Sequence, residues 1–243
     1  MTLVLPPVIG HRGAAAIAPE NTLAAIRAAA AGGVAMVEVD AKLTADGVAI
    51  LLHDDDLDRT TDGSGPAAAR TAEEFARLDA GSWFAPQFAG EPVPTLDAAL
   101  ALVVELGLAI NIEIKPCPGR DVETAKIVLA TARAAWPGGL APPLVSSFSL
   151  ECLEVAAQLA ADWPRGYLIW DRPADWRAVA DRLGAASLHV SPDRTSAADM
   201  AQYLADGRPV AAYTINDAAA AAALWQAGVA AVFSDDPASL LPR

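Results

Sequence analysis

Residues 36–53 read MVEVDAKLTADGVAILLH, two short apolar runs joined by a polar turn. In the first run, Glu38 and Asp40 alternate with valine and alanine. Successive side chains of a strand point to opposite faces, so both carboxylates share one face of the predicted strand and the apolar side chains share the other. Two carboxylates at this spacing often only belong to the solvent-exposed face of a strand. Other residues of the chain are needed to show whether these two have a function.

The turn within this stretch predicts how the two runs pair. The connection, residues 43–47, is shorter than the roughly one dozen residues that a crossover between parallel strands needs, and it ends in Asp46-Gly47, which is typical of a hairpin. We therefore predict that the second run is antiparallel to the first. A hairpin folded about residues 45 and 46 would place His53 opposite Glu38.

On both sides of this hairpin, short apolar runs alternate with alanine-rich runs of helical period. This alternation predicts an α/β fold in which parallel strands form a barrel and helices pack outside it. One more strand is predicted than the eight that a barrel needs, and the antiparallel strand accounts for it. The predicted strands span 8–10, 36–42, 48–52, 109–114, 144–147, 167–170, 187–190, 210–214 and 231–234. The predicted helices span 22–31, 96–105, 122–134, 150–160, 173–183, 197–205 and 218–226, with Asn21, Thr95, Asp121, Ser149 and Asp217 as predicted caps.

Residues 54–94 interrupt the alternation with a segment rich in Gly, Pro, Asp and Thr. Only residues 72–78 have a helical pattern there. Loops of this length are usually functional or disordered, and we expect this one to be an insertion over the barrel mouth. The length of 243 residues suits one barrel, so residues 1–243 are predicted to form a single catalytic domain with an insertion at about 54–94.

The composition is that of a protein with a large core, since 53% of the residues are apolar and 19% are charged. The net charge of −13 disfavours contact with nucleic acid and with anionic membrane surfaces. Residues 1–7 lack the basic and apolar regions of a signal peptide, and the longest apolar stretches are too short to cross a bilayer. Cys117 and Cys152 are too few for a disulfide framework. We expect a cytoplasmic protein with reduced thiols and no stable membrane association.

The run Asn111-Ile112-Glu113-Ile114-Lys115 repeats the pattern of the first strand. Its three polar residues share one face, although parallel barrel strands are normally apolar on both faces. Inward charges of this kind need a partner. Carboxylates from two strands suit a hard divalent cation such as Mg²⁺ or Ca²⁺, and Glu38, Asp40 and Glu113 are the candidate ligands. Lys115 could hold a phosphate oxygen or neutralise a neighbouring carboxylate.

Two of the three histidines, His11 and His53, follow predicted strands and stand beside charged residues. Histidine titrates near neutral pH, so one ring could accept a proton from an attacking hydroxyl while the other donates one to the leaving oxygen. Arg12 has the bidentate geometry that suits phosphate, although it could instead pair with Glu20 or Glu38.

Two kinds of enzyme fit these residues. A glycoside hydrolase would use a pair of carboxylates about 5 to 10 Å apart and no metal. Phosphoryl chemistry is favoured, because two cationic side chains and two histidines accompany three carboxylates, and the charge on a phosphate has to be stabilised.

An ordered set of motifs spans almost the whole chain and resembles the glycerophosphodiester phosphodiesterase family, in particular its short cytoplasmic bacterial members. The motifs are His11-Arg12-Gly13, Pro19-Glu20-Asn21-Thr22, Glu38-Val39-Asp40, Thr44-Ala45-Asp46-Gly47, His53-Asp54, Arg59-Thr60-Thr61, Pro94-Thr95-Leu96, Asn111-Ile112-Glu113-Ile114-Lys115, Ser146-Ser147-Phe148 and Asp235-Asp236-Pro237.

The resemblance implies a TIM-type (β/α)8 barrel with a small insertion after the third strand. It also implies hydrolysis of glycerophosphodiesters, such as glycerophosphocholine or glycerophosphoethanolamine, to sn-glycerol 3-phosphate and an alcohol. By the same analogy His11 and His53 are the acid/base pair, a divalent metal (Mg²⁺ or Ca²⁺) binds to Glu38, Asp40 and Glu113, and Arg12 and Lys115 bind the phosphate. The substrate's own glycerol hydroxyl is expected to attack first, which gives a cyclic phosphate that water then opens. Glu20 is expected to orient Arg12 or close the site, unless residues 19–22 simply begin a helix.

Some positions depart from the family pattern. Tyr213 stands where the family usually has tryptophan, so we expect it to contact the substrate's alcohol and to alter the headgroup preference. Ser234 replaces a usual threonine and keeps the hydroxyl. For His189, structural and substrate-contact roles are equally expected. A catalytically silent sensor of glycerophosphodiesters is the alternative from another class of protein, and the sequence leaves a homodimer open.

Overall fold

The computed structural model describes residues 3–241, and in that range eight parallel strands close into a barrel. The strands are β1 (Val8–Gly10), β2 (Met36–Leu43), β4 (Ala109–Ile114), β5 (Leu144–Ser147), β6 (Arg165–Ile169), β7 (Ser187–Val190), β8 (Val210–Ala212) and β9 (Ala231–Ser234). β1 pairs with both β9 and β2, which closes the ring. The predicted barrel is confirmed.

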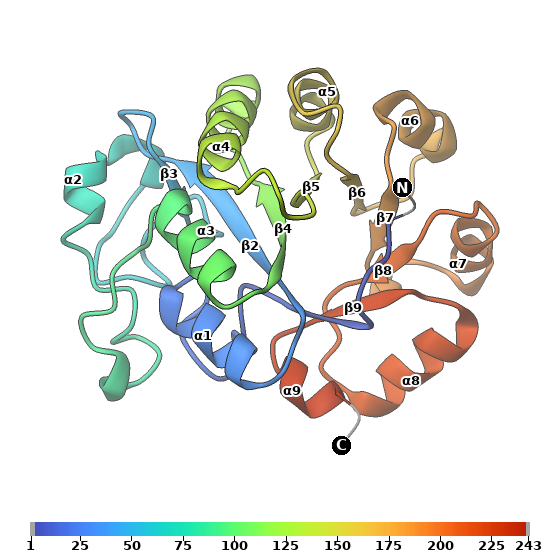
Figure 1. Cartoon of the computed structure of the whole chain (residues 1–243), viewed down its shortest axis with the longest axis horizontal. Coiled ribbons are helices and arrows are strands. Elements are labelled where there is room, and N and C mark those ends of the chain that lie inside the picture. Colours follow the sequence, from blue (N-terminus) through green and yellow to red (C-terminus); the bar gives the residue numbers. More distant parts are fainter. Residues whose placement is uncertain (1–2, 242–243) are drawn as a thin grey trace.

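Helices follow most barrel strands and surround the barrel (Figure 1). They are α1 (Leu23–Ala31), α3 (Leu96–Glu105), α4 (Asp121–Ala135), α5 (Leu150–Leu159), α6 (Trp176–Leu183), α7 (Ala197–Leu204) and α8 (Ala218–Ala227), with a short α9 (Pro237–Leu240) that was not predicted. Across residues 3–241, none of the helices combines the length and the apolar character that crossing a bilayer requires. Met1 and Thr2, part of the segment expected to lack an export signal, lie outside the described residues.

The surplus strand β3 (Ala49–Leu51) pairs antiparallel with the end of β2, as predicted. The register differs from the prediction by one residue, because Ala41 lies opposite Leu51 and the Leu52 amide donates to the Asp40 carbonyl. His53 therefore does not lie opposite Glu38, and that predicted pairing was wrong. The prediction assumed a two-residue turn at residues 45 and 46. In the structure Gly47 also belongs to the turn, in the left-handed region at φ 79°, and this extra residue shifts the register.

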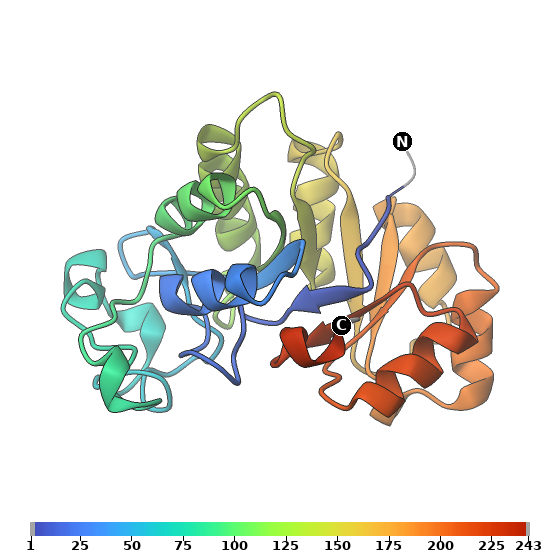
Figure 2. The ribbon, with the colours of Figure 1, turned by 60° about the horizontal axis from the view of Figure 1, so that its bottom comes forward.

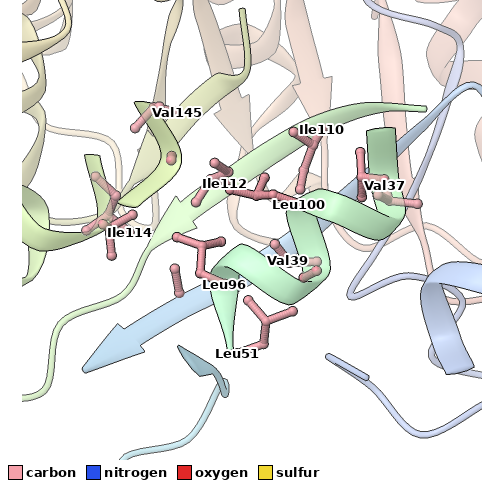
Figure 3. Close-up of a cluster of buried hydrophobic side chains, with 14 of the residues drawn as sticks. Val37, Val39, Leu51, Leu96, Leu100, Ile110, Ile112, Ile114 and Val145 are labelled. Carbon is pink, nitrogen blue, oxygen red and sulfur yellow. The ribbon is translucent and has the colours of Figure 1, made fainter. Parts of the chain in front are cut away.

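The outward faces of β2 and β4 pack against α3 in the largest apolar cluster. Figure 3 shows Val39 and Ile112 from the strands beside Leu96 and Leu100 from the helix. These are the apolar positions that alternate with the polar ones. Burying them fixes which face of each strand points outward, so the polar residues of the same strands must point into the barrel.

The segment between β3 and α3 contains the helix α2 (Ala72–Phe75) and two 3₁₀ turns at Ala67–Ala69 and Pro86–Phe88. It packs its own small apolar cluster, which includes Leu57 and Phe75, and lies on the side of the barrel near α1 (Figures 1 and 2). The Ala24 amide of α1 donates to Glu91 of this segment. None of residues 54–94 lines the cavity at the barrel mouth, but Asp54 of this segment bonds to the cavity residue His53. A separate apolar cluster holds the segment against the barrel, and the expected cover over the mouth stays a prediction.

Three of the five predicted cap residues are at the cap position, and two of these three form a side-chain bond with the helix. Ser149 and Asp217 accept backbone N–H groups of α5 and α8. Thr95 is at the cap position of α3 without a side-chain bond, and Asp121 is already the first residue of α4. Thr22, not Asn21, caps α1.

Candidate active site

A cavity of about 620 Å³ opens at the carboxyl ends of the barrel strands. This is the end at which barrel enzymes place their sites, because the loops that leave the strands converge there. The lining combines charged residues from the first half of the chain with apolar and aromatic residues from the second half. It consists of His11, Arg12, Glu38, His53, Asn111, Glu113, Lys115, Phe148, Leu168, Trp170, Tyr213, Thr214 and Phe233.

Three buried carboxylates meet on one side of this cavity. Asp40 lies directly opposite Glu113 on the neighbouring strand, and Glu38 lies opposite Asn111. One oxygen from each of Glu38, Asp40 and Glu113 lies within 4.8 Å of the others. The strand alternation seen in the sequence thus brings all three together.

Burial and mutual repulsion disturb the protonation of this cluster. Burial, together with the Asp40 charge, raises the pKa of Glu113 to about 7 and that of Glu38 well above its usual range. Burial alone would raise the pKa of Asp40 as well, but the charges of Lys115 and Arg12 outweigh it and hold that pKa below its usual range. Three carboxylates this close cannot all be ionised at neutral pH without a compensating charge.

The donor set fits a hard divalent cation. The Glu38 Oε1 and Asn111 Oδ1 atoms are buried and lack a hydrogen-bond partner within the described structure. Oxygen donors of this kind suit Mg²⁺ or Ca²⁺.

Arg12 and Lys115 supply positive charge next to the carboxylates. Lys115 Nζ lies 3.1 Å from Glu113 and 3.6 Å from Asp40, and Arg12 Nε lies 3.3 Å from Asp40. Both predicted alternatives for Lys115 therefore remain compatible with the geometry, since it neutralises its neighbours and also faces the cavity.

The turn after β1 aims the backbone of Arg12 at the cluster. Arg12 has φ 52°, which is unusual for a residue other than glycine. In this conformation its amide donates to Glu38 Oε2 at 2.9 Å, and the Gly13 amide donates to the Glu38 carbonyl. A side chain at Gly13 would collide with the backbone of Ala25 in α1, so glycine is required there. Strain of this kind is typical of functional sites.

His11 is held by an acid from the other end of the chain. Its Nδ1 lies 2.6 Å from Asp235 Oδ1, and the Asn216 amide donates to the other Asp235 oxygen at 2.8 Å. Burial raises the pKa of Asp235, but the hydrogen bond with His11 outweighs it and the net pKa is lowered. An ionised Asp235 fixes the tautomer with hydrogen on Nδ1 and leaves Nε2 as the nitrogen available to a ligand.

His53 has an equivalent partner, because its Nδ1 lies 2.6 Å from Asp54 Oδ1. Arg59, in the insertion, donates to both Asp54 oxygens at 2.6 and 2.9 Å. Burial lowers the pKa of His53, and the positive charges of Arg12 and Lys115 lower it further. The negative charge of Asp40 raises this pKa but does not outweigh them. His53 is therefore neutral near pH 7 and able to accept a proton.

Arg59 also joins the two halves of the polar site. It donates to Glu20 at 2.6 and 2.8 Å, and Glu20 accepts from Arg12 at 2.6 Å. One guanidinium thus restrains both the carboxylate that holds Arg12 and the carboxylate that holds His53. Arg59 belongs to one of the motifs found in the sequence, but no role was predicted for it. Nothing in the neighbouring sequence indicates that it contacts Glu20.

Asn21 is a second residue whose role was missed. It was predicted to be a cap, but its backbone has φ 56° and its side chain forms two hydrogen bonds with Asp40. The Asn21 side-chain amide donates to Asp40 Oδ2, and the Asp40 backbone amide donates to Asn21 Oδ1. The hydrogen bond from Arg12 to Glu20 supports the expectation that Glu20 orients Arg12, while Thr22 caps α1.

Tyr213 and His189, the last two residues singled out in the sequence, differ in whether they line the cavity. Tyr213, just after β8, lines the cavity. His189 does not line it. The His189 ring is fully buried in the barrel beside Phe233, and its Nε2 lies 2.9 Å from the Ser187 hydroxyl. Burial lowers the pKa of His189 to about 3. Of the two expected roles, the position favours the structural one.

Comparisons with known proteins agree with this geometry. Residues 11–239 match the model of the glycerophosphoryl diester phosphodiesterase family. A glycerophosphodiester phosphodiesterase of Caldanaerobacter subterraneus is 31% identical, over 96% of both chains. A phosphodiesterase of Oleispira antarctica, solved with its product sn-glycerol-3-phosphate, is 38% identical and superimposes with a TM-score of 0.93 over 97% of this chain and 95% of that one. A glycerophosphodiester phosphodiesterase of Agrobacterium tumefaciens is 30% identical, with a TM-score of 0.80 over 97% of this chain and 99% of that one.

Proposed function

Since the chain belongs to the glycerophosphoryl diester phosphodiesterase family and is a phosphoric diester hydrolase, we propose that it cleaves glycerophosphodiesters to sn-glycerol 3-phosphate and an alcohol by metal-assisted acid/base catalysis. The observation that carries the proposal is the convergence of Glu38, Asp40 and Glu113 at a cavity lined by two histidines, each of which has a carboxylate on its Nδ1.

His53 is the proposed base in the first step. It accepts the proton of the substrate's glycerol hydroxyl as that oxygen attacks phosphorus, and its lowered pKa supports this role. His11 enters this step with a proton on both ring nitrogens and donates the Nε2 proton to the leaving alcohol oxygen, while Asp235 stabilises the ring through Nδ1. In the second step the roles reverse, and water opens the cyclic phosphate.

Arg12 and Lys115 are the proposed phosphate-binding residues. Their positive charges lie beside the carboxylate cluster, where they can bind non-bridging phosphate oxygens as charge develops in the transition state. A Mg²⁺ or Ca²⁺ ion held by Glu38, Asp40 and Glu113 would add Lewis-acid stabilisation of the phosphate. The remaining parts of the proposal are a single catalytic domain over residues 1–243 and a cytoplasmic location.

The proposal is tested by assaying glycerophosphocholine and glycerophosphoethanolamine hydrolysis with each metal in turn. Activity should be lost in EDTA and restored by Mg²⁺ or Ca²⁺, and His53→Ala should lower turnover about 100-fold or more. Turnover that persists in EDTA would refute the metal scheme. Stoichiometric binding without product would favour a sensor instead.

A further inference from the structure

Three aromatic side chains form one wall of the cavity, which we call the aromatic wall: Phe148 after β5, Trp170 after β6 and Tyr213 after β8. The Phe148 ring makes edge contacts with both others, at centroid distances of 6.3 Å to Trp170 and 5.8 Å to Tyr213. Trp170 is 55% exposed and Phe148 is 37% exposed. Exposed aromatic rings grouped at a catalytic cavity are typical of a surface that a ligand covers.

The aromatic wall offers little polar chemistry. The Tyr213 hydroxyl donates to the Ile169 carbonyl at 2.8 Å, so the phenol proton is already used and the ring itself faces the cavity. Leu168 and Phe233 extend the same lining with apolar surface. Both residues are buried in the barrel. The charged groups of the cavity, in contrast, come from the turns after β1 and β3 and from β2 and β4.

Aromatic walls can also bind cations, but here two cations of the protein already lie against these rings. The Arg194 guanidinium lies 4.6 Å from the centre of the Trp170 ring, and Lys115 Nζ lies 5.7 Å from the centre of the Phe148 ring. The negative π-faces are therefore partly satisfied from within. Asp171, the carboxylate nearest in sequence to the wall, forms an ion pair with Arg194. Glu113, which also lies near Tyr213, forms an ion pair with Lys115. A quaternary ammonium group placed against these rings would therefore find both nearby carboxylates already paired.

We propose that the aromatic wall binds the alcohol half of the substrate and selects an uncharged, apolar alcohol over a cationic one such as choline. The inference rests on the proposed function, because it concerns the leaving group of that reaction. Phosphate bound near Arg12 and Lys115 lies on the charged side of the cavity, so one ester arm can extend along Phe148 and Trp170. Apolar groups on that arm gain by leaving water, whereas an ammonium group loses hydration without gaining an ion pair.

The test compares glycerophosphocholine with glycerophospho-3,3-dimethylbutanol, in which carbon replaces the quaternary nitrogen at nearly the same size and shape. The value of kcat/KM should be about fivefold or more higher for the neutral ester, which is the scale of discrimination that an apolar pocket provides. Trp170→Ala should bring the ratio of the two values close to one. Trp170→Leu, which keeps apolar contact, should preserve most of the preference.

Trp83→Ala is the matched control, because Trp83 is also exposed and lies in the insertion outside the cavity lining. It should leave the ratio unchanged. A choline ester that is hydrolysed as well as or better than its neutral isostere would overturn the inference, as would a Trp170→Ala variant that loses activity equally on both esters. Failure of the wild-type protein to hydrolyse either ester would instead count against the proposed function.

Discussion

Replacing Glu113 with glutamine should stabilise the metal-free protein at alkaline pH while abolishing its activity. Burial and the Asp40 charge raise the pKa of Glu113 from 4.5 to about 7. In the unfolded chain the same carboxyl ionises near its ordinary value, so the folded state holds the proton more tightly. The stability that this group contributes is therefore present below about pH 4.5 and is lost as the pH rises to about 7.

The size of this loss follows from the change in pKa. At about 1.36 kcal/mol for each pH unit, the metal-free wild type loses roughly 3 kcal/mol between about pH 4.5 and pH 7 through Glu113. A glutamine side chain cannot ionise, so the Glu113→Gln variant lacks this loss. The difference in free energy of unfolding between variant and wild type should therefore grow by about that amount over this range.

Urea unfolding in EDTA at pH 5 and pH 8 measures this difference. Glu105→Gln, an exposed position on α3, is the control and should show no such change. Saturating metal should stabilise the wild type by about 3 kcal/mol at 100 times the dissociation constant, which raises the melting temperature by roughly 5 to 10 °C. The variant should lose most of this gain. A difference between variant and wild type that does not change with pH would refute the reasoning.

Three further predictions concern residues that support the site. Arg59→Gln should lower kcat about 10- to 100-fold with a smaller change in KM, because Glu20 and Asp54 both lose a charged partner. Arg77→Gln, in the same insertion, should leave kcat unchanged. Equal effects of the two substitutions on kcat would contradict the role of Arg59. Asp235→Asn should lower kcat about 100-fold while metal-induced stabilisation in a thermal melt persists, since Asp235 bonds to His11 and not to the carboxylate cluster. His189→Gln should make the folding stability less sensitive to acid. Burial lowers the pKa of His189 to about 3, so the stability that this group contributes is present above about pH 6.5 and is lost as the pH falls toward 3. The free energy of unfolding should therefore drop less between pH 7 and pH 4 in the variant than in the wild type.

The amino-acid pattern was sufficient to predict the barrel and the carboxylates that face its interior. Glu38 and Asp40 share a face because strand side chains alternate, and the same holds for Asn111 and Glu113. Burial of the intervening valines and isoleucines then leaves only the interior for the carboxylates. The antiparallel third strand was also predictable, because a connection as short as residues 43–47 cannot hold a barrel helix.

Folding in three dimensions decided how these residues are held. His11 and Asp235 are 224 positions apart and meet only because β1 pairs with β9 at barrel closure. Arg59 reaches Glu20, which is 39 positions away, only because the insertion packs beside α1. The one-residue shift of the hairpin was likewise set by the shape of the turn at Gly47. Alternation along a strand is a local property of the backbone, whereas these contacts depend on ring closure and loop packing, which no local period encodes.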